Sequence, residues 1–113
     1  MLAASGVAHF GAGMLGGTAG LAALAAWAGV VAARCDGLYV AFDLDAIDAS
    51  ERLSLAMPEP GGISLEAAVS AVAVLAGTMP IVGIGATAAM PRDGLDFGAT
   101  VDAIARLAEA ALG

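Results

Sequence analysis

Three aspartates at the end of one apolar run are the residues of this chain best suited to chemistry. Asp43 and Asp45 follow residues 37–42 (Gly-Leu-Tyr-Val-Ala-Phe), and Asp48 comes three positions later. The run is short, bounded by glycine, and contains β-branched and aromatic side chains, which is typical of a buried parallel strand. Because side chains alternate along a strand, Asp-x-Asp at its carboxyl end would aim two carboxylates into one crevice, where open α/β sheets bind their ligands.

Two carboxylates this close repel each other unless something neutralises them. A shared proton could do so, and a divalent metal ion does it better, since hard oxygen donors favour Mn²⁺, Mg²⁺ or Ca²⁺ over softer metals. The alternative is structural, because aspartates at strand ends also cap turns and helices through the neighbouring backbone. The spacing alone leaves both a metal site and a capped turn open.

A rigid turn, residues 58–62 (Pro-Glu-Pro-Gly-Gly), follows the aspartates and precedes a predicted helix. Together with residues 42–48, it resembles the ureohydrolases, the family of arginases, agmatinases and formimidoylglutamases. Their Phe-Asp-x-Asp-x-x-Asp and Pro-x-Pro-Gly-Gly segments occur in this order and at this spacing. Residues 82–85 and 90–93 are similar to a later strand and turn of that family, so the resemblance covers about residues 37–112.

The resemblance implies a binuclear Mn²⁺ site, where a metal-bridging hydroxide attacks the guanidinium or amidine carbon of a substrate such as arginine or agmatine. Two cations lower the pKa of water and hold it against that planar carbon. By the same resemblance, Asp43 and Asp45 are metal ligands. Asp48 is interpreted as a carboxylate that stabilises the turn or supports the ligands without binding the metal itself. No catalytic residue and no substrate-binding residue of this chain is assigned.

The chain departs from the family pattern at the acidic positions that bind the cationic substrate, here called the substrate anchor. Ala88 stands where many members have a glutamate that binds the guanidinium, and Gly85 replaces the acid that usually starts that segment. A cationic substrate would lose a charge-assisted hydrogen bond worth about 1.5 to 3 kcal/mol.

The metal ligands are also incomplete by comparison with the family, which takes an Asp-x-His-x-x-x-Asp cluster and further histidines from a preceding half. The histidine of this chain, His9, lies at the end of a predicted strand and is interpreted as structural rather than as a ligand. We therefore expect residues 1–113 to be a single partial domain, the carboxyl-terminal half of an arginase-like fold, and to be inactive alone. The alternative is a non-catalytic relative or subunit fragment that keeps the fold for packing or association.

Strand and helix signals alternate along the chain, which predicts a parallel sheet, and the resemblance implies an α/β fold with three α/β/α layers that is only partly present here. The predicted strands cover residues 6–10, 38–42 and 80–84. The predicted helices cover residues 18–33, 64–76 and 96–112, with Thr18 and Ser64 as N-caps and Gly77 ending the second. The last helix is predicted to bury an apolar stripe formed by Phe97, Val101, Ile104, Ala108 and Leu112.

Composition fits a core fragment better than a free-standing domain. Hydrophobic residues make up 60% of the chain and charged residues 13%, against roughly 45–50% and 25% in ordinary soluble domains. Such a chain should expose apolar patches and unpaired strand edges, which predicts association, a homo-oligomer being one form of it.

Charge and cysteine usage limit the partners and the compartment. A net charge of −7 with scattered arginines argues against nucleic acid. No Asp, Glu, Lys or Arg precedes Arg34, and residues 15–33 approach the length of a membrane span, but their alanines and glycines insert weakly, so a buried helix is predicted instead. The single Cys35 allows no internal disulfide and indicates a reducing cytoplasm. The expected partner is a small guanidino or amidino substrate, with neither nucleic acid nor membrane.

Overall fold

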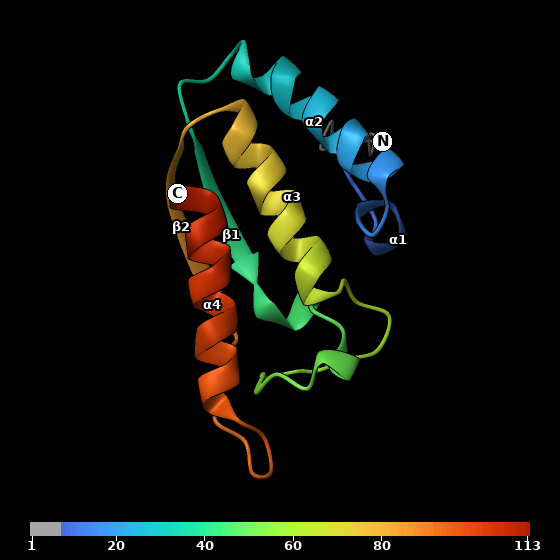
Figure 1. The fold of residues 1–113 in the computed structure, drawn as a ribbon, viewed down its shortest axis with the longest axis vertical. Coiled ribbons are helices and arrows are strands. Elements are labelled where there is room, and N and C mark those ends of the chain that lie inside the picture. Colours follow the sequence, from blue (N-terminus) through green and yellow to red (C-terminus); the bar gives the residue numbers. More distant parts are fainter. Residues whose placement is uncertain (1–7) are drawn as a thin grey trace.

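The computed structural model describes residues 8–113, which form a two-stranded parallel sheet with helices on one side of it (Figure 1). The α-helices are α1 (Ala12–Leu15), α2 (Thr18–Ala32), α3 (Leu65–Thr78) and α4 (Phe97–Leu112). The strands are β1 (Leu38–Asp43) and β2 (Ile81–Thr87), and two short 3-10 helices, η1 (Leu44–Ala46) and η2 (Ala49–Glu51), follow β1. The predicted partial α/β fold with a parallel sheet is confirmed.

Strand β1 forms where the apolar run predicted it and extends by one residue to Asp43. Its side chains alternate between half-buried and exposed, beginning with half-buried Leu38. In the parallel register, Tyr39 lies opposite Gly83 and Asp43 lies opposite Thr87. The strand therefore presents one side to the helices and carries Asp43 on the other side, at its carboxyl end.

Helices α3 and α4 lie over the same face of the strands, and α2 lies beside α3 (Figure 1). The core gathers between α3, α4 and the loop after β1, around Leu44, Ile47, Leu55, Val72 and Leu107. On the opposite face of the sheet, Tyr39 and Val82 are 61% and 73% exposed. Within residues 8–113, helices thus cover one face of the sheet and leave the other open.

The helix boundaries follow their capping residues, with two corrections. Ser64 caps α3 as predicted, since its Oγ accepts a hydrogen bond from the Ala67 N–H at 3.1 Å. Gly77 does not end this helix, which continues to Thr78, where the side-chain hydroxyl donates to the Val74 carbonyl at 2.9 Å. At α2, the N-cap is Gly17 rather than Thr18, which is the first helical residue.

The buried face of α4 differs from the predicted one. Asp96 caps the helix, and Thr100, Ala103, Leu107 and Ala111 are its buried residues. Phe97, Val101 and Leu112 of the predicted stripe are exposed instead. The small side chains let α4 approach α3 and β2 closely, and Thr100 supplies a hydrogen-bond acceptor to a buried backbone N–H, so this face packs better than the bulkier one.

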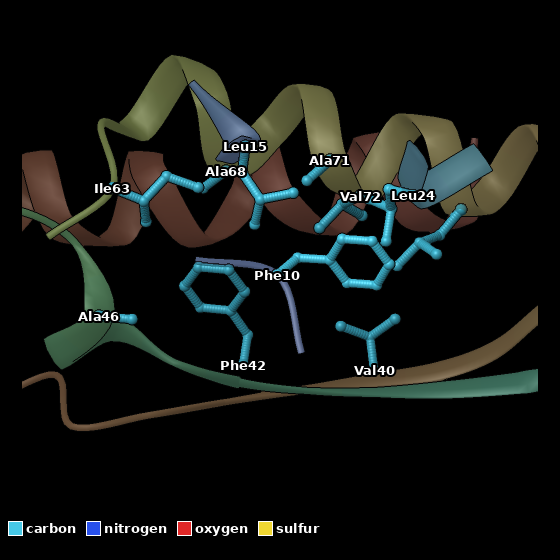
Figure 2. A pocket seen from close by; sticks show the side chains of 11 residues that line it. Phe10, Leu15, Leu24, Val40, Phe42, Ala46, Ile63, Ala68, Ala71 and Val72 are labelled. Carbon is cyan, nitrogen blue, oxygen red and sulfur yellow. The ribbon is translucent and has the colours of Figure 1, made fainter. Parts of the chain in front are cut away.

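An apolar cavity of about 290 Å³ separates α3 from β1 (Figure 2). Val40 and Phe42 of β1 face Ala71 and Val72 of α3 across it, and Phe10 reaches in between. All of its lining side chains are apolar, so it offers no group for catalysis or metal binding.

The predicted strand at residues 6–10 falls mostly at the edge of the described chain. Residues 6 and 7 lie outside the described residues, and His9 and Phe10 belong to no strand. Among helices of residues 8–113, none combines the length and apolar character that crossing a membrane requires.

Candidate metal-binding site

The carboxyl end of β1 turns sharply at the first aspartate. Asp43 is the last strand residue, and its Oδ1 accepts a hydrogen bond from the Asp45 N–H at 2.9 Å, which caps η1. Strand alternation therefore stops at Asp43. A tight turn, rather than an extended Asp-x-Asp, brings Asp45 to the same end of the sheet.

Asp43 and Asp45 each use one carboxylate oxygen to accept a hydrogen bond from the backbone. Asp45 is half-buried, and its Oδ1 accepts a hydrogen bond from the Met57 N–H at 2.9 Å. Within residues 8–113, the other oxygen of Asp43 and the other oxygen of Asp45 accept no hydrogen bond. The turn thus holds two anionic oxygens that remain available to a cation, and the hard donors match the ions expected from the sequence.

Asp48 is saturated with backbone donors instead. Its Oδ2 accepts from the Ser50 N–H at 2.9 Å, and its Oδ1 accepts from the N–H groups of Gly61 at 2.7 Å and Gly62 at 3.0 Å. The Ser50 side chain, followed by the N–H groups of Ser50, Gly62 and Gly61, lowers the pKa of Asp48 from 3.8 to about 2 by hydrogen bonding to the ionised carboxylate. Asp48 therefore ties the Pro-Gly-Gly turn to the aspartate turn, which is the geometry of a turn carboxylate.

The Pro-Gly-Gly turn needs both glycines for distinct reasons. Gly61 has a φ of 85°, a left-handed conformation that glycine adopts without strain. A Cβ on Gly62 would lie 2.5 Å from the Ala46 carbonyl oxygen and 2.7 Å from the Asp48 nitrogen. The turn packs this closely because the Asp48 N–H donates to Ile63 O at 2.8 Å and the Ile63 N–H donates to Ala46 O at 3.0 Å.

The described residues do not complete a metal site. No three His, Cys, Asp or Glu side chains of residues 8–113 gather closely enough to hold a metal ion, so exposed His9 forms no such group with Asp43 and Asp45. A divalent cation prefers about six oxygen or nitrogen donors. Asp43 and Asp45 fit part of such a ligand set, and the further donors must come from groups other than these two aspartates.

The positions that depart from the family's substrate anchor carry no acid into the site. Ala88 is half-buried with a φ of 75°, and its carbonyl accepts from the Ala56 N–H at 2.9 Å. Gly83 and Gly85 lie beneath the Tyr39 side chain: a Cβ at Gly83 would come within 3.1 Å of the ring, and a Cβ at Gly85 would clash with the hydroxyl oxygen.

Sequence reasoning missed the groups that hold the loop after η2. Ser54 is buried, its N–H donates to Thr100 Oγ1 at 2.7 Å, and its hydroxyl donates to the Met90 carbonyl. Arg92 donates to the carbonyls of Leu55 and Ala56. The available signal was an arginine beside a proline just after β2, which is too common a pattern to single out.

This arrangement defines a class: a partial α/β fold with a carboxylate pair at the carboxyl end of a parallel strand, where such folds place their ligands. The sequence model of the arginase family matches residues 5–113. The chain belongs to the arginase family, and the resemblance found in its motifs is confirmed.

Two solved structures show the same fold. The arginase of Entamoeba histolytica in complex with L-ornithine superimposes with a TM-score of 0.66 and 19% identity, over 80% of this chain and 30% of that one. The native arginase of Bacillus caldovelox at pH 5.6 gives 0.64 and 22%, over 82% and 31%. This chain thus spans about a third of the length of these arginases. No curated protein sequence matches it.

Proposed function

We propose that this chain supplies Asp43 and Asp45 to the Mn²⁺ site of a ureohydrolase, an enzyme that hydrolyses a C–N bond of a guanidinium or amidine substrate. One observation carries the proposal: in a chain of the arginase family, one turn holds both carboxylates, each with an oxygen left for a cation. Arginase-family membership supports hydrolase chemistry, and the fold of two arginases supports the placement.

Bound Mn²⁺ would act as a Lewis acid and make a nucleophilic water available near neutral pH. The residues of this chain would hold the cations and keep the carboxylates that bind them in position. Asp43 and Asp45 would bind the cations, the Met57 N–H fixes one oxygen of Asp45, and Asp48 keeps the Pro-Gly-Gly turn against them. In the overall reaction, water adds to the substrate carbon, the C–N bond breaks, and the leaving amine takes a proton.

The net charge of −7 suits a cationic guanidino or amidino substrate, which an acidic protein attracts. Ala88 and Gly85 carry no acid, so an acidic anchor for that substrate would have to come from other positions. The single cysteine fits a reducing cytoplasm.

Manganese binding tests the proposal directly. Titrating the full chain with Mn²⁺ and following free Mn²⁺ by electron paramagnetic resonance should show binding that Asp43→Asn and Asp45→Asn each weaken about tenfold or more. Asp36→Asn is the matched control, because this exposed aspartate precedes the opposite end of β1, and it should bind as the unaltered chain does. Equal binding by all four proteins would refute the assignment.

Turnover is expected only when the remaining donors are present. With excess Mn²⁺ and either arginine or agmatine, residues 1–113 alone should release no urea, because two carboxylates do not fill the coordination of two cations. Metal-dependent release of urea would contradict this.

The second candidate function is a non-catalytic relative that keeps the fold for association. The absence of an acid at Ala88 and Gly85 favours it, together with the open face of the sheet at Tyr39 and Val82. Mn²⁺ binding that depends on Asp43 and Asp45 would favour the enzyme over this alternative.

A further inference from the structure

Arg92 donates its hydrogen bonds to backbone carbonyls rather than to a carboxylate. Its Nε donates to Leu55 O at 2.6 Å and its Nη2 donates to Ala56 O at 2.7 Å. Among residues 8–113, the one ion pair joins Arg106 to Glu66, so Arg92 has no acidic partner there. A guanidinium presents its donors in a rigid fork, and here the fork fixes two consecutive peptide groups.

The second of these peptide groups connects Arg92 to the candidate site. The Ala56 carbonyl and the Met57 N–H belong to one planar peptide unit. Its oxygen accepts from Arg92, and its N–H donates to Asp45 Oδ1 at 2.9 Å. One peptide plane therefore separates the guanidinium from the carboxylate, and hydrogen bonds in such a chain polarise and strengthen one another.

The rest of the loop is anchored by neutral groups. Ser54 bonds to Thr100 and to Met90, and the Ala56 N–H donates to Ala88 O. These bonds hold the loop against α4 and the segment after β2. Arg92 is the charged member of this set, and it acts on the peptide that faces Asp45.

We propose that Arg92 is a positioning residue for the Asp45 carboxylate and acts through the Ala56–Met57 peptide. Holding that peptide aims the Met57 N–H at Oδ1 and leaves the other oxygen of Asp45 directed to a cation. The consequence for Mn²⁺ rests on the proposed function, whereas the orientation of Asp45 does not.

Arg92→Met removes the fork and keeps an unbranched apolar stem, and Arg106→Met is its matched control on the surface of α4. We expect the Met57 amide of Arg92→Met to exchange with solvent at least about tenfold faster and to move upfield in the ¹H–¹⁵N spectrum, with Arg92→Lys recovering part of the change. In Arg106→Met, the Met57 amide should stay unchanged. A Met57 amide that is the same in Arg92→Met and the unaltered chain would overturn the proposal.

Asp45→Asn tests the same coupling from the other end, should Arg92→Met lose its fold. The neutral amide accepts a weaker hydrogen bond from Met57, so the ¹³C resonance of the Ala56 carbonyl should shift while Arg92 is intact. An unshifted resonance would count against the proposal.

Metal binding separates this proposal from the proposed function. If the unaltered chain binds Mn²⁺, Arg92→Met should lower the affinity about tenfold, as the loss of a group supporting a ligand does, and Arg106→Met should not. An unchanged affinity in Arg92→Met would overturn the positioning role. If no protein binds Mn²⁺, the proposed function fails, and the Met57 amide still decides whether Arg92 orients Asp45.

Discussion

Asp48 shows how a single carboxylate organises the loop around the site. It accepts hydrogen bonds from the Ser50, Gly61 and Gly62 N–H groups, which lie on two separate turns. Hydrogen bonds to the ionised form stabilise it, which is why its pKa falls to about 2. The folded protein therefore prefers Asp48 ionised, and this preference links its charge to stability.

The link between the charge of Asp48 and folding predicts that the protein loses stability at acid pH. Because the folded pKa, about 2, lies below the unfolded value of 3.8, Asp48 stabilises the fold above about pH 4, and this contribution disappears as the pH falls toward 2. Urea unfolding at pH 7 should show Asp48→Asn to be less stable than the unaltered chain, with the difference shrinking between pH 4 and 2. A difference that stays constant down to pH 2 would contradict the assignment, and Asp36→Asn serves as the control.

Gly62 gives a second prediction at the scale of one residue. Gly62→Ala places a Cβ 2.5 Å from the Ala46 oxygen and 2.7 Å from the Asp48 nitrogen, both backbone atoms that cannot rotate away. We expect a loss of about 2 kcal/mol or more in the free energy of unfolding, as overpacked sites typically show. Gly77→Ala is the control: it meets open space within α3 and should stabilise by about 0.5 to 1 kcal/mol. Equal effects of both substitutions would disprove the steric explanation.

At the scale of elements, α4 does more than cover the sheet. Thr100 sits on its buried face and accepts the Ser54 N–H, so the helix satisfies a donor that lies in the loop next to the site. The Arg106–Glu66 pair between α4 and α3 is solvent-exposed and adds at most about 1 kcal/mol. The buried bond therefore matters more to the attachment of α4 than the surface ion pair does.

Thr100→Val should reveal the importance of that bond. Valine keeps the shape of threonine but leaves the buried Ser54 N–H without an acceptor, at a cost of about 1 to 3 kcal/mol. Thr87→Val, at the exposed end of β2, should change the unfolding free energy by less than about 0.5 kcal/mol. Chemical denaturation of the two variants measures this, and a Thr100→Val protein as stable as Thr87→Val would show the bond to be unimportant.

For the whole molecule, the open face of the sheet is the dominant feature. Tyr39 covers the two glycines of β2, and Val82 stands out beside it, with no helix of residues 8–113 over them. Apolar surface of this kind, with unpaired strands, promotes contact with other chains. The helical face, by contrast, is closed by α3 and α4 (Figure 1).

Association of the isolated chain should run through this face. Val82→Lys places a charge on this face and should weaken self-association about tenfold in sedimentation experiments. This is the effect expected when one valine side chain is no longer buried on association. Val30→Lys is the control, because Val30 is 61% exposed on α2, away from the sheet face. A stronger effect of Val30→Lys than of Val82→Lys would place the contact elsewhere.

Local order in the sequence was enough to predict most of the elements. Strand β1, helix α3 and helix α4 begin within a residue of their predicted starts, because apolar periodicity and a cap such as Ser64 are properties of neighbouring residues. The Asp43, Asp45 and Asp48 segment and the Pro-Gly-Gly turn were likewise recognisable from order and spacing, and they led to the arginase family.

The sequence by itself thus determined the family, the parallel α/β fold and the segment in which the candidate site lies. Only the tertiary structure decided which face of α4 is buried, that a turn rather than the strand places Asp45, and that Arg92 reaches its peptide. The physical reason is that these features depend on residues far apart in the sequence. A face is buried only against a partner of matching shape, and the hydrogen bonds of Arg92 join groups 36 and 37 positions apart, which no local pattern encodes.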